Sequence, residues 1–240
     1  MGTKVKQKKC VLLLSGGADS ATLLGIAKYE GYQVYALTVD YGQRHDEEIE
    51  MARKQADIFC AEEHLVLKLD LTGISKSALT GDGDVPKGDL TKHEEYGADR
   101  SEIPVTYVPA RNTIFLSLAL GWAETVGTGH IFIGVNAIDY SGYPDCRPEF
   151  IESFLNTARL ATKLGVEGGE VEIHTPLIKK SKGEIFELGR ELGVDFSITH
   201  SCYSPVGGRA CGLCESCQLR RKGFEDAELK DPTEYSNVSG

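Results

Sequence analysis

The sequence predicts an α/β fold with a doubly wound parallel sheet, and three observations support this prediction. Short apolar runs, typical of strands buried on both faces, alternate with longer segments of helical pattern. No dipeptide typical of a tight hairpin joins two of these runs, so neighbouring strands are expected to be parallel. The segments richest in polar side chains follow strands expected to end near residues 14, 40, 108 and 135, which is the sheet edge where ligands bind.

The first predicted strand, residues 11–14, leads into a glycine turn with the features of a phosphate-binding loop. Residues 15–20 read Ser-Gly-Gly-Ala-Asp-Ser, and a helix is expected over residues 21–30 with Ser20 as its cap. Two glycines let the backbone approach a ligand closely, and the free N–H groups of a helix start favour an anion. The turn is neither a Walker loop nor a dinucleotide-binding GxGxxG motif.

The turn resembles the SGGxDS pyrophosphate loop of the N-type ATP pyrophosphatase (PP-loop) superfamily; the alternative is an ordinary glycine-rich turn. Members of the superfamily use ATP to adenylate a carbonyl or carboxyl oxygen. The resemblance implies ATP as a ligand, with Mg²⁺ on its phosphates. The residues implied in nucleotide binding are Leu14, Ser15, Gly16, Gly17, Ala18, Asp19 and Ser20, together with Asp40 and Tyr41 at the end of the second strand, where the adenosine is usually met.

The remaining elements continue the alternation. Further strands are expected over residues 33–40, 65–69, 105–108, 130–135 and 172–177, and helices over residues 46–61, 113–126, 149–164 and 182–192. Residues 72–102 are polar and glycine-rich, and no regular structure is assigned to them. We expect an ATP-binding α/β domain over residues 1–198 and a small zinc-binding helical segment, packed on it, over residues 199–240.

Four of the seven cysteines lie close together near the C-terminus. Cys202, Cys211, Cys214 and Cys217 have the spacing C-x8-C-x2-C-x2-C. Four thiolates satisfy the tetrahedral preference of Zn²⁺ and would close its coordination sphere, as in a structural site. An iron–sulfur cluster could use the same ligands, and a disulfide pair would require an oxidising compartment. Structural zinc is the prediction.

The composition restricts the partners of the chain. Its 240 residues are 41% hydrophobic and 26% charged, with a formal net charge of −10. This acidic balance disfavours nucleic acid as a partner, because binding to phosphates depends on Lys and Arg. The apolar run after the basic start is too short for a signal peptide, and no run of 18 apolar residues predicts a membrane span. We expect a cytoplasmic protein with no membrane partner.

The motifs together resemble the 7-cyano-7-deazaguanine synthase (QueC) family over nearly the whole chain. The matching segments are residues 15–20, 40–45, 108–112, 134–135, 139–147, 175–177, 201–203 and 211–220. Many members have glycine at the position of Ala110. The resemblance implies ATP-dependent conversion of 7-carboxy-7-deazaguanine and ammonia to the nitrile through adenylated carboxylate and amide intermediates. It also implies one zinc per chain and commonly a homodimer.

Four residues are candidates for a direct part in this chemistry. Arg111 and Lys182, each after a different strand, are expected to neutralise phosphate charge, although each could instead form a surface ion pair. Asp19 is expected to fix the loop or to help hold Mg²⁺. His45 is a candidate general base, and a purely local hydrogen-bonding role is equally consistent with its position.

The segment 139–147 suits a flat, guanine-like substrate. Tyr140 and Tyr143 offer stacking faces, Asp139 or Asp145 could accept from ring N–H groups, and Arg147 could pair with a carboxylate. The alternative is a structured Gly-Pro turn with solvated charges.

Other functions of the same superfamily remain open from the sequence. One is a tRNA-thiolating or lysidine-forming enzyme, and another is a paralogue that stops at the amide. A non-catalytic nucleotide-binding module is a third, although the Ser and Asp of the loop are intact.

Overall fold

The computed structural model describes residues 7–43, 46–81, 84–87, 103–137 and 142–236. Five parallel strands form one sheet in the order β3-β2-β1-β4-β5. The strands are β1 (Lys9–Leu13), β2 (Gln33–Asp40), β3 (Glu63–Lys68), β4 (His130–Phe132) and β5 (Glu172–His174). The predicted parallel sheet is therefore confirmed.

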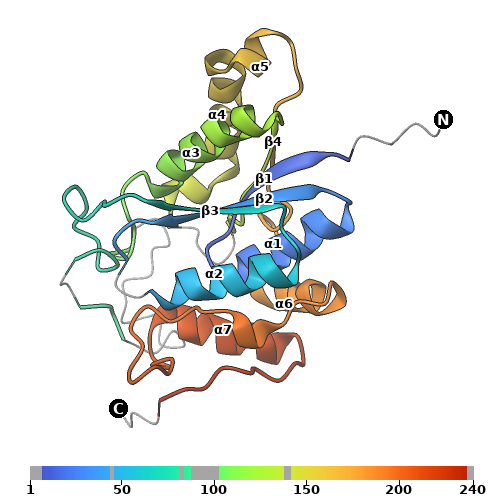
Figure 1. The fold of residues 1–240 in the computed structure, drawn as a ribbon. Coiled ribbons are helices and arrows are strands. Elements are labelled where there is room, and N and C mark those ends of the chain that lie inside the picture. Colours follow the sequence, from blue (N-terminus) through green and yellow to red (C-terminus); the bar gives the residue numbers. More distant parts are fainter. Residues whose placement is uncertain (1–6, 44–45, 82–83, 88–102, 138–141, 237–240) are drawn as a thin grey trace.

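Helices cover both faces of the sheet (Figure 1). On one face lie α1 (Ala18–Tyr29), α2 (Glu47–Ile58) and α6 (Lys182–Glu191), with α7 (Glu215–Asp226) beyond them. On the other face lie α3 (Arg111–Val126) and α4 (Pro148–Ala161), followed by the short α5 (Lys163–Val166). Two 3₁₀ helices, η2 (Pro144–Cys146) and η3 (Phe196–Ile198), complete the elements used below. Among the described residues, no helix is long and apolar enough to cross a membrane.

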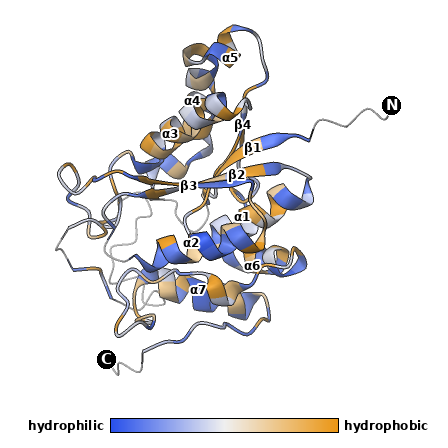
Figure 2. Cartoon of the chain, viewed as in Figure 1, coloured by the Kyte–Doolittle hydropathy of each residue, from blue (hydrophilic) through white to orange (hydrophobic). Residues whose placement is uncertain are grey.

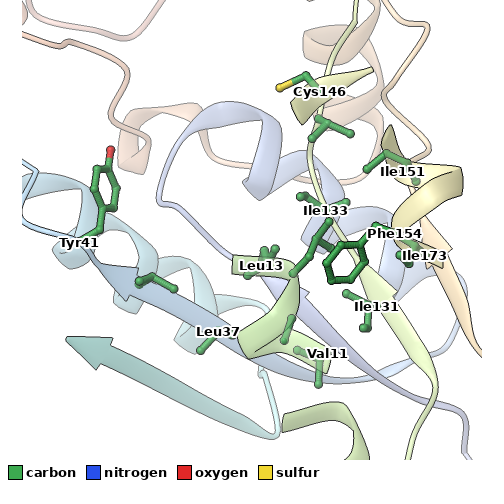
Figure 3. Close-up of a cluster of buried hydrophobic side chains, with 14 of the residues drawn as sticks. Val11, Leu13, Leu37, Tyr41, Ile131, Ile133, Cys146, Ile151, Phe154 and Ile173 are labelled. Atoms are coloured by element: carbon green, nitrogen blue, oxygen red, sulfur yellow. The ribbon is translucent and has the colours of Figure 1, made fainter. Parts of the chain in front are cut away.

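The position of the central strand β1 explains why residues 10–14 form an uninterrupted apolar run. Val11 and Leu13 belong to the hydrophobic core beneath α3 and α4, whereas Leu12 and Leu14 belong to the core beneath α1. Side chains of a strand alternate between faces, so a strand covered on both sides must be apolar at every position. Figure 3 shows Val11 and Leu13 in one cluster with Phe154 of α4. Figure 2 shows the contrast between the hydrophobic strands and the hydrophilic residues along α2.

Several local predictions were wrong. The strands expected over residues 130–135 and 172–177 end at Phe132 and His174. Residues 105–108 form turns rather than a strand, because Pro104 and Pro109 lack the N–H of a ladder and the carbonyl of Val105 accepts from Ala78 N at 3.0 Å. The helix expected over 149–164 ends at Ala161, and the Thr162 side chain caps α5. The first helix begins at Ala18 rather than residue 21.

The C-terminal segment packs against the sheet's helical layer through aromatic rings. The rings of Phe186 in α6 and Phe224 in α7 stack at 3.9 Å, and Phe196 meets both edge-on. The guanidinium of Arg220 lies 5.1 Å from the centre of the Phe224 ring. These contacts fix α7, and with it the neighbouring cysteines, on α6.

Candidate active site

A cavity of about 260 Å³ opens at the carboxyl ends of β1 and β4, where the strand order reverses. The loop after β1, the ends of β2 and β4, the start of α3 and the C-terminal segment all contribute to its wall. The predicted site residues in this wall are Leu14, Ser15, Gly17, Ala18, Asp19, Ser20, Tyr41, Arg111, Tyr143 and Lys182. Elements far apart in the chain therefore converge where the sequence pattern placed the site.

The glycine turn has its shape fixed from two sides. Gly16 has φ +85°, and a Cβ at this position would overlap the carbonyl oxygen of Glu48 in α2. The carbonyl of Gly16 accepts hydrogen bonds from Gln55 Nε2 at 2.9 Å and from the backbone N of His200 at 3.0 Å. Only glycine fits this close approach, and both α2 and the segment before the cysteines hold the turn in place.

The first residues of α1 line the cavity and have no acceptor for their amides within the helix. The N-cap is Gly17, and the first intrahelical bond runs from Ala21 N to Gly17 O at 3.1 Å. The N–H groups of Ala18, Asp19 and Ser20 thus have no acceptor within the helix, and they coincide with its positive dipole end. This arrangement can bind an anion.

Ser20 does not cap the helix, so that prediction was wrong. Its Oγ accepts from Ser15 N at 3.2 Å and from Ser15 Oγ at 3.1 Å, and it donates to Gly17 O at 3.0 Å. Ser20 lies inside the first turn, because α1 begins two residues before it. Its hydroxyl therefore braces the turn from within.

Lys182 and Asp19 form an ion pair in the cavity wall. Lys182 Nζ lies 2.8 Å from each carboxylate oxygen of Asp19, and the two side chains are only 11% and 19% exposed. Lys182 is the first residue of α6, whose start is fixed by a capping box between Ser181 and Glu184. The cation thus lies beside the loop, paired but within the cavity rather than on the outer surface.

Arg111 lies at the start of α3 among aromatic side chains. Its Nη1 donates to Tyr41 Oη at 3.5 Å, and its guanidinium lies 5.8 Å from the centre of the Tyr41 ring. Burial opposes its charge, but the surrounding Tyr41, Tyr143 and Tyr203 raise the pKa of Arg111 above its ordinary value. A guanidinium remains charged throughout the physiological range, so Arg111 supplies a fixed cation.

Glu48 is a cavity residue that sequence reasoning missed. It lines the wall from the first turn of α2, and burial raises its pKa to about 7 against the lowering effect of Arg111. The charged helix suggested a solvated face. A signal was nevertheless present, since Glu48 precedes buried Ala52 by one helical turn and therefore shares its face.

The predicted substrate segment is only partly placed at the cavity. Tyr143 is buried in the wall, and its hydroxyl lies 2.6 Å from Thr106 Oγ1. Asp145 lies outside the wall and caps α3 instead, with Oδ2 accepting from Asn112 N at 2.9 Å. Arg147 is exposed and also lies outside the wall. Asp139, Tyr140 and His45 lie outside the described residues.

Asp40 and Cys146 differ in their relation to the cavity. Asp40 is not in the wall, and its Oδ1 accepts from Gly42 N at 3.4 Å. Cys146 lines the cavity, but burial raises the pKa of its thiol to about 12. A thiol of this kind is a poor nucleophile at neutral pH.

The four C-terminal cysteines form a preformed metal-binding group. Each is at most 3% exposed, and their sulfur atoms lie within 4.8 Å of one another. Backbone N–H groups point at the sulfurs, from Cys211 to Cys202 Sγ at 3.2 Å and from Cys214 to Cys211 Sγ at 3.3 Å. Such donors stabilise thiolates. The donor set and its closure fit a structural Zn²⁺ held by Cys202, Cys211, Cys214 and Cys217.

The cysteine group lies directly beside the cavity. His200, Ser201 and Cys202 contribute to the wall, as does Arg220 of α7, a second residue that sequence reasoning missed. The Arg220 side chain is 3% exposed and donates to Thr199 Oγ1 at 2.8 Å. It also donates to Phe196 O at 3.0 Å and to Asp231 at 3.1 Å. These hydrogen bonds connect Thr199, the neighbour of the wall residue His200, to α7.

Comparison with known proteins gives full-length matches. The family model described as "Queuosine biosynthesis protein QueC" matches residues 9–228. A protein of Desulfatibacillum aliphaticivorans named 7-cyano-7-deazaguanine synthase is 58% identical over 233 residues, which cover 96% of this chain and 98% of that protein. A protein of Saccharophagus degradans with the same name is 56% identical over 234 residues, which cover 97% of this chain and all of that protein.

Solved structures resemble the chain more distantly. NMN synthetase from Francisella tularensis aligns with a TM-score of 0.47 and 16% identity, over 94% of this chain and 89% of that one.

Proposed function

Because this chain belongs to the family of the queuosine biosynthesis protein QueC, we propose that it is a carbon–nitrogen ligase that makes 7-cyano-7-deazaguanine. Its substrates are 7-carboxy-7-deazaguanine, ammonia and ATP. The observation that carries the proposal is the 56–58% identity, over nearly the full length, to proteins named as this synthase. The cavity supports it, since an anion-binding turn and two cations lie together at the switch point of the sheet.

In the proposed reaction the substrate carboxylate attacks the α-phosphorus of ATP and displaces pyrophosphate. Ammonia then attacks the acyl adenylate, loses a proton and displaces AMP, which gives the amide. The amide oxygen attacks a second ATP in the same way. Loss of AMP and two protons then gives the nitrile. Each activation replaces a poor leaving group by AMP, so the enzyme must stabilise pyrophosphate twice.

The turn after β1 is the proposed pyrophosphate site. Ala18, Asp19 and Ser20 line the cavity, and their amides have no acceptor within the helix. Lys182 contacts Asp19 beside them. Arg111 supplies the second cation from across the cavity wall. Mg²⁺ would be held by phosphate oxygens and Asp19, whose carboxylate oxygens keep lone pairs beyond those used by Lys182. The ion would supply further charge neutralisation.

Glu48 is the proposed proton acceptor for ammonium. A carboxyl group whose pKa is near 7 is divided between both protonation states at neutral pH, which suits a general base. Its position in the wall, facing the charge of Arg111, places it in the same cavity as the nucleotide turn. It fills the role for which the sequence offered only His45.

We extend the proposal to the rest of the molecule. Residues 1–198 form the ATP-binding domain, and residues 199–240 form a zinc-binding segment packed on it. The zinc ion supplies no chemistry to the reaction and fixes the wall around His200. The enzyme acts in the cytoplasm as a homodimer without nucleic acid, and Tyr143 contacts the deazapurine.

One assay tests the activity. Purified protein is incubated with ATP, ammonium and 7-carboxy-7-deazaguanine, and products are identified by mass spectrometry. We expect the nitrile, with two AMP formed per nitrile. Accumulation of the amide alone identifies a paralogue that stops at the first step, and turnover that requires tRNA identifies a tRNA-modifying enzyme. Either result overturns the proposal.

A matched pair of variants connects the activity to the cavity. The double variant Asp19→Asn/Lys182→Met removes both charges of the buried pair, which avoids leaving one of them uncompensated. We expect it to remain folded and to lose at least about tenfold in ATP affinity, the equivalent of about 1.4 kcal/mol. Lys163→Met removes an exposed lysine paired with Glu167 and should leave affinity unchanged. Equal affinities for the two variants would contradict the assigned phosphate site.

A further inference from the structure

A second group of potential metal ligands lies away from the cavity, where β4 and β5 pair. His130 Nδ1 and His174 Nε2 are 3.1 Å apart, and Glu172 Oε2 lies 3.7 Å from each of these nitrogens. None of the three residues lines the cavity described above. The donors are two imidazoles and one carboxylate, the set found in many three-ligand transition-metal sites.

The register of the strands creates this group. His130 pairs with Glu172, and Phe132 pairs with His174, so all four side chains lie on the same face of the sheet. The face is the one covered by α1, since Phe132 belongs to the core beneath that helix. The three donor side chains therefore meet because of the fold and not through flexible surface contacts.

The separations fit one ion. Ligand atoms about 2.1 Å from an ion and at tetrahedral angles to one another are about 3.4 Å apart. The observed separations of 3.1, 3.7 and 3.7 Å differ from this value by only a few tenths of an ångström. The side chains of His130 and His174 are 12% and 16% exposed, whereas that of Glu172 is 50% exposed, so the group opens to solvent on one side.

The surroundings hold both rings and add negative charge. The ring of His174 stacks on Phe132 at 4.2 Å, and Tyr32 meets both histidine rings edge-on. Glu170 Oε2 lies 4.0 Å from His130 Nε2, the nitrogen that is not part of the group. A carboxylate at the second nitrogen of a ligating histidine orients the ring and raises its basicity. A depression lined by Glu30, Glu172 and His174 leads to the group.

We propose that His130, His174 and Glu172 bind a divalent transition-metal ion such as Zn²⁺, with water completing its coordination. The ion is distinct from the zinc of the cysteine group. It joins the edge strand β5 to β4 and stabilises the folded chain when bound. A direct hydrogen bond between the two imidazoles is the arrangement without metal.

The test is a zinc titration of the untagged full-length protein that already carries one zinc per chain. Calorimetry should show a second equivalent binding with a dissociation constant in the micromolar range or below. His174→Gln and Glu172→Gln should each weaken this second binding at least tenfold while retaining the first zinc. Glu172→Gln changes a half-exposed side chain and so preserves the fold. Glu170→Gln should weaken it by about tenfold through the ring orientation of His130.

Two control variants complete the design. His64→Asn removes a histidine that contacts Thr38 on another part of the sheet, and Glu167→Gln removes an exposed carboxylate paired with Lys163. Both should keep the second equivalent. A wild-type protein that binds only one zinc would overturn the proposal. So would a second equivalent whose affinity is the same in wild type, His174→Gln and Glu172→Gln.

Discussion

Substitution of Gly16 gives the sharpest test of how the glycine turn, residues 15–20, is held in shape. Gly16→Ala places a Cβ onto the carbonyl oxygen of Glu48 and forces alanine into φ +85°. The left-handed backbone costs about 1–2 kcal/mol, and the displacement of packed backbone adds about 1–3 kcal/mol. The expected loss of stability is therefore about 3 kcal/mol, which corresponds to a fall of roughly 10 °C in melting temperature for a chain of this size.

Gly17→Ala is the matched control. Gly17 has φ −80°, and its Cβ would lie 3.4 Å from Ser15 Oγ and 3.5 Å from the carbonyl oxygen of His200, which are ordinary contacts. Its melting temperature should stay within about 2 °C of wild type. Differential scanning calorimetry measures the melting temperatures of both variants. In an ATP titration, only Gly16→Ala should show reduced ATP affinity. If the two variants melt together, the turn is not constrained by α2 as described.

Three further predictions concern the cavity and its support. Glu48→Gln should abolish an inflection near pH 7 in the pH profile of kcat/KM for ammonium. Burial raises the pKa of Glu48 and favours its protonated form, so the wild-type protein should lose stability as pH rises from about 4.5 through 7. Urea titrations at several pH values should show that Glu48→Gln lacks this loss. Zinc removal by a chelator should lower both the melting temperature and the ATP affinity, because His200 lies beside Cys202 and its backbone N–H donates to Gly16 O. Unchanged ATP affinity in the metal-free protein would contradict this link. Ala110 has φ 56°, a left-handed conformation that costs alanine about 1–2 kcal/mol, whereas glycine costs about 0.4–1 kcal/mol in unfolded-state entropy. Ala110→Gly should therefore raise the free energy of unfolding by up to about 1 kcal/mol in chemical denaturation, and a loss of stability would contradict backbone strain at this position.

The sheet could be predicted from the sequence because its signals are local. Residues 10–14 before the turn are all apolar, and residues 34–37 of β2 form a second apolar run. The segment 105–108 has the same β-branched and aromatic composition, yet its flanking prolines prevent ladder bonds. Composition alone thus overestimates strands wherever the flanking residues lack donors.

Arg111 and Lys182 were predicted from their places after strands, and most of the other predicted wall residues belong to short motifs. The glycine turn and the cysteines are such motifs. The spacing of Glu48 to Ala52 places it on the buried face of α2, but its position in the cavity, like that of Arg220, depends on how the helices α2 and α7 dock. Asp145 illustrates the opposite case, since a carboxylate in a promising motif is used to cap α3. Tertiary packing decides which charged side chains reach the cavity.

The hydrogen bond from His200 to Gly16 has a consequence for the order of events during synthesis. One of the donors that fix the carbonyl of Gly16 is the backbone N–H of His200, which is translated long after Gly16. Long-range contacts of this kind close late in folding. A growing chain therefore cannot complete the support of this turn until synthesis has passed His200.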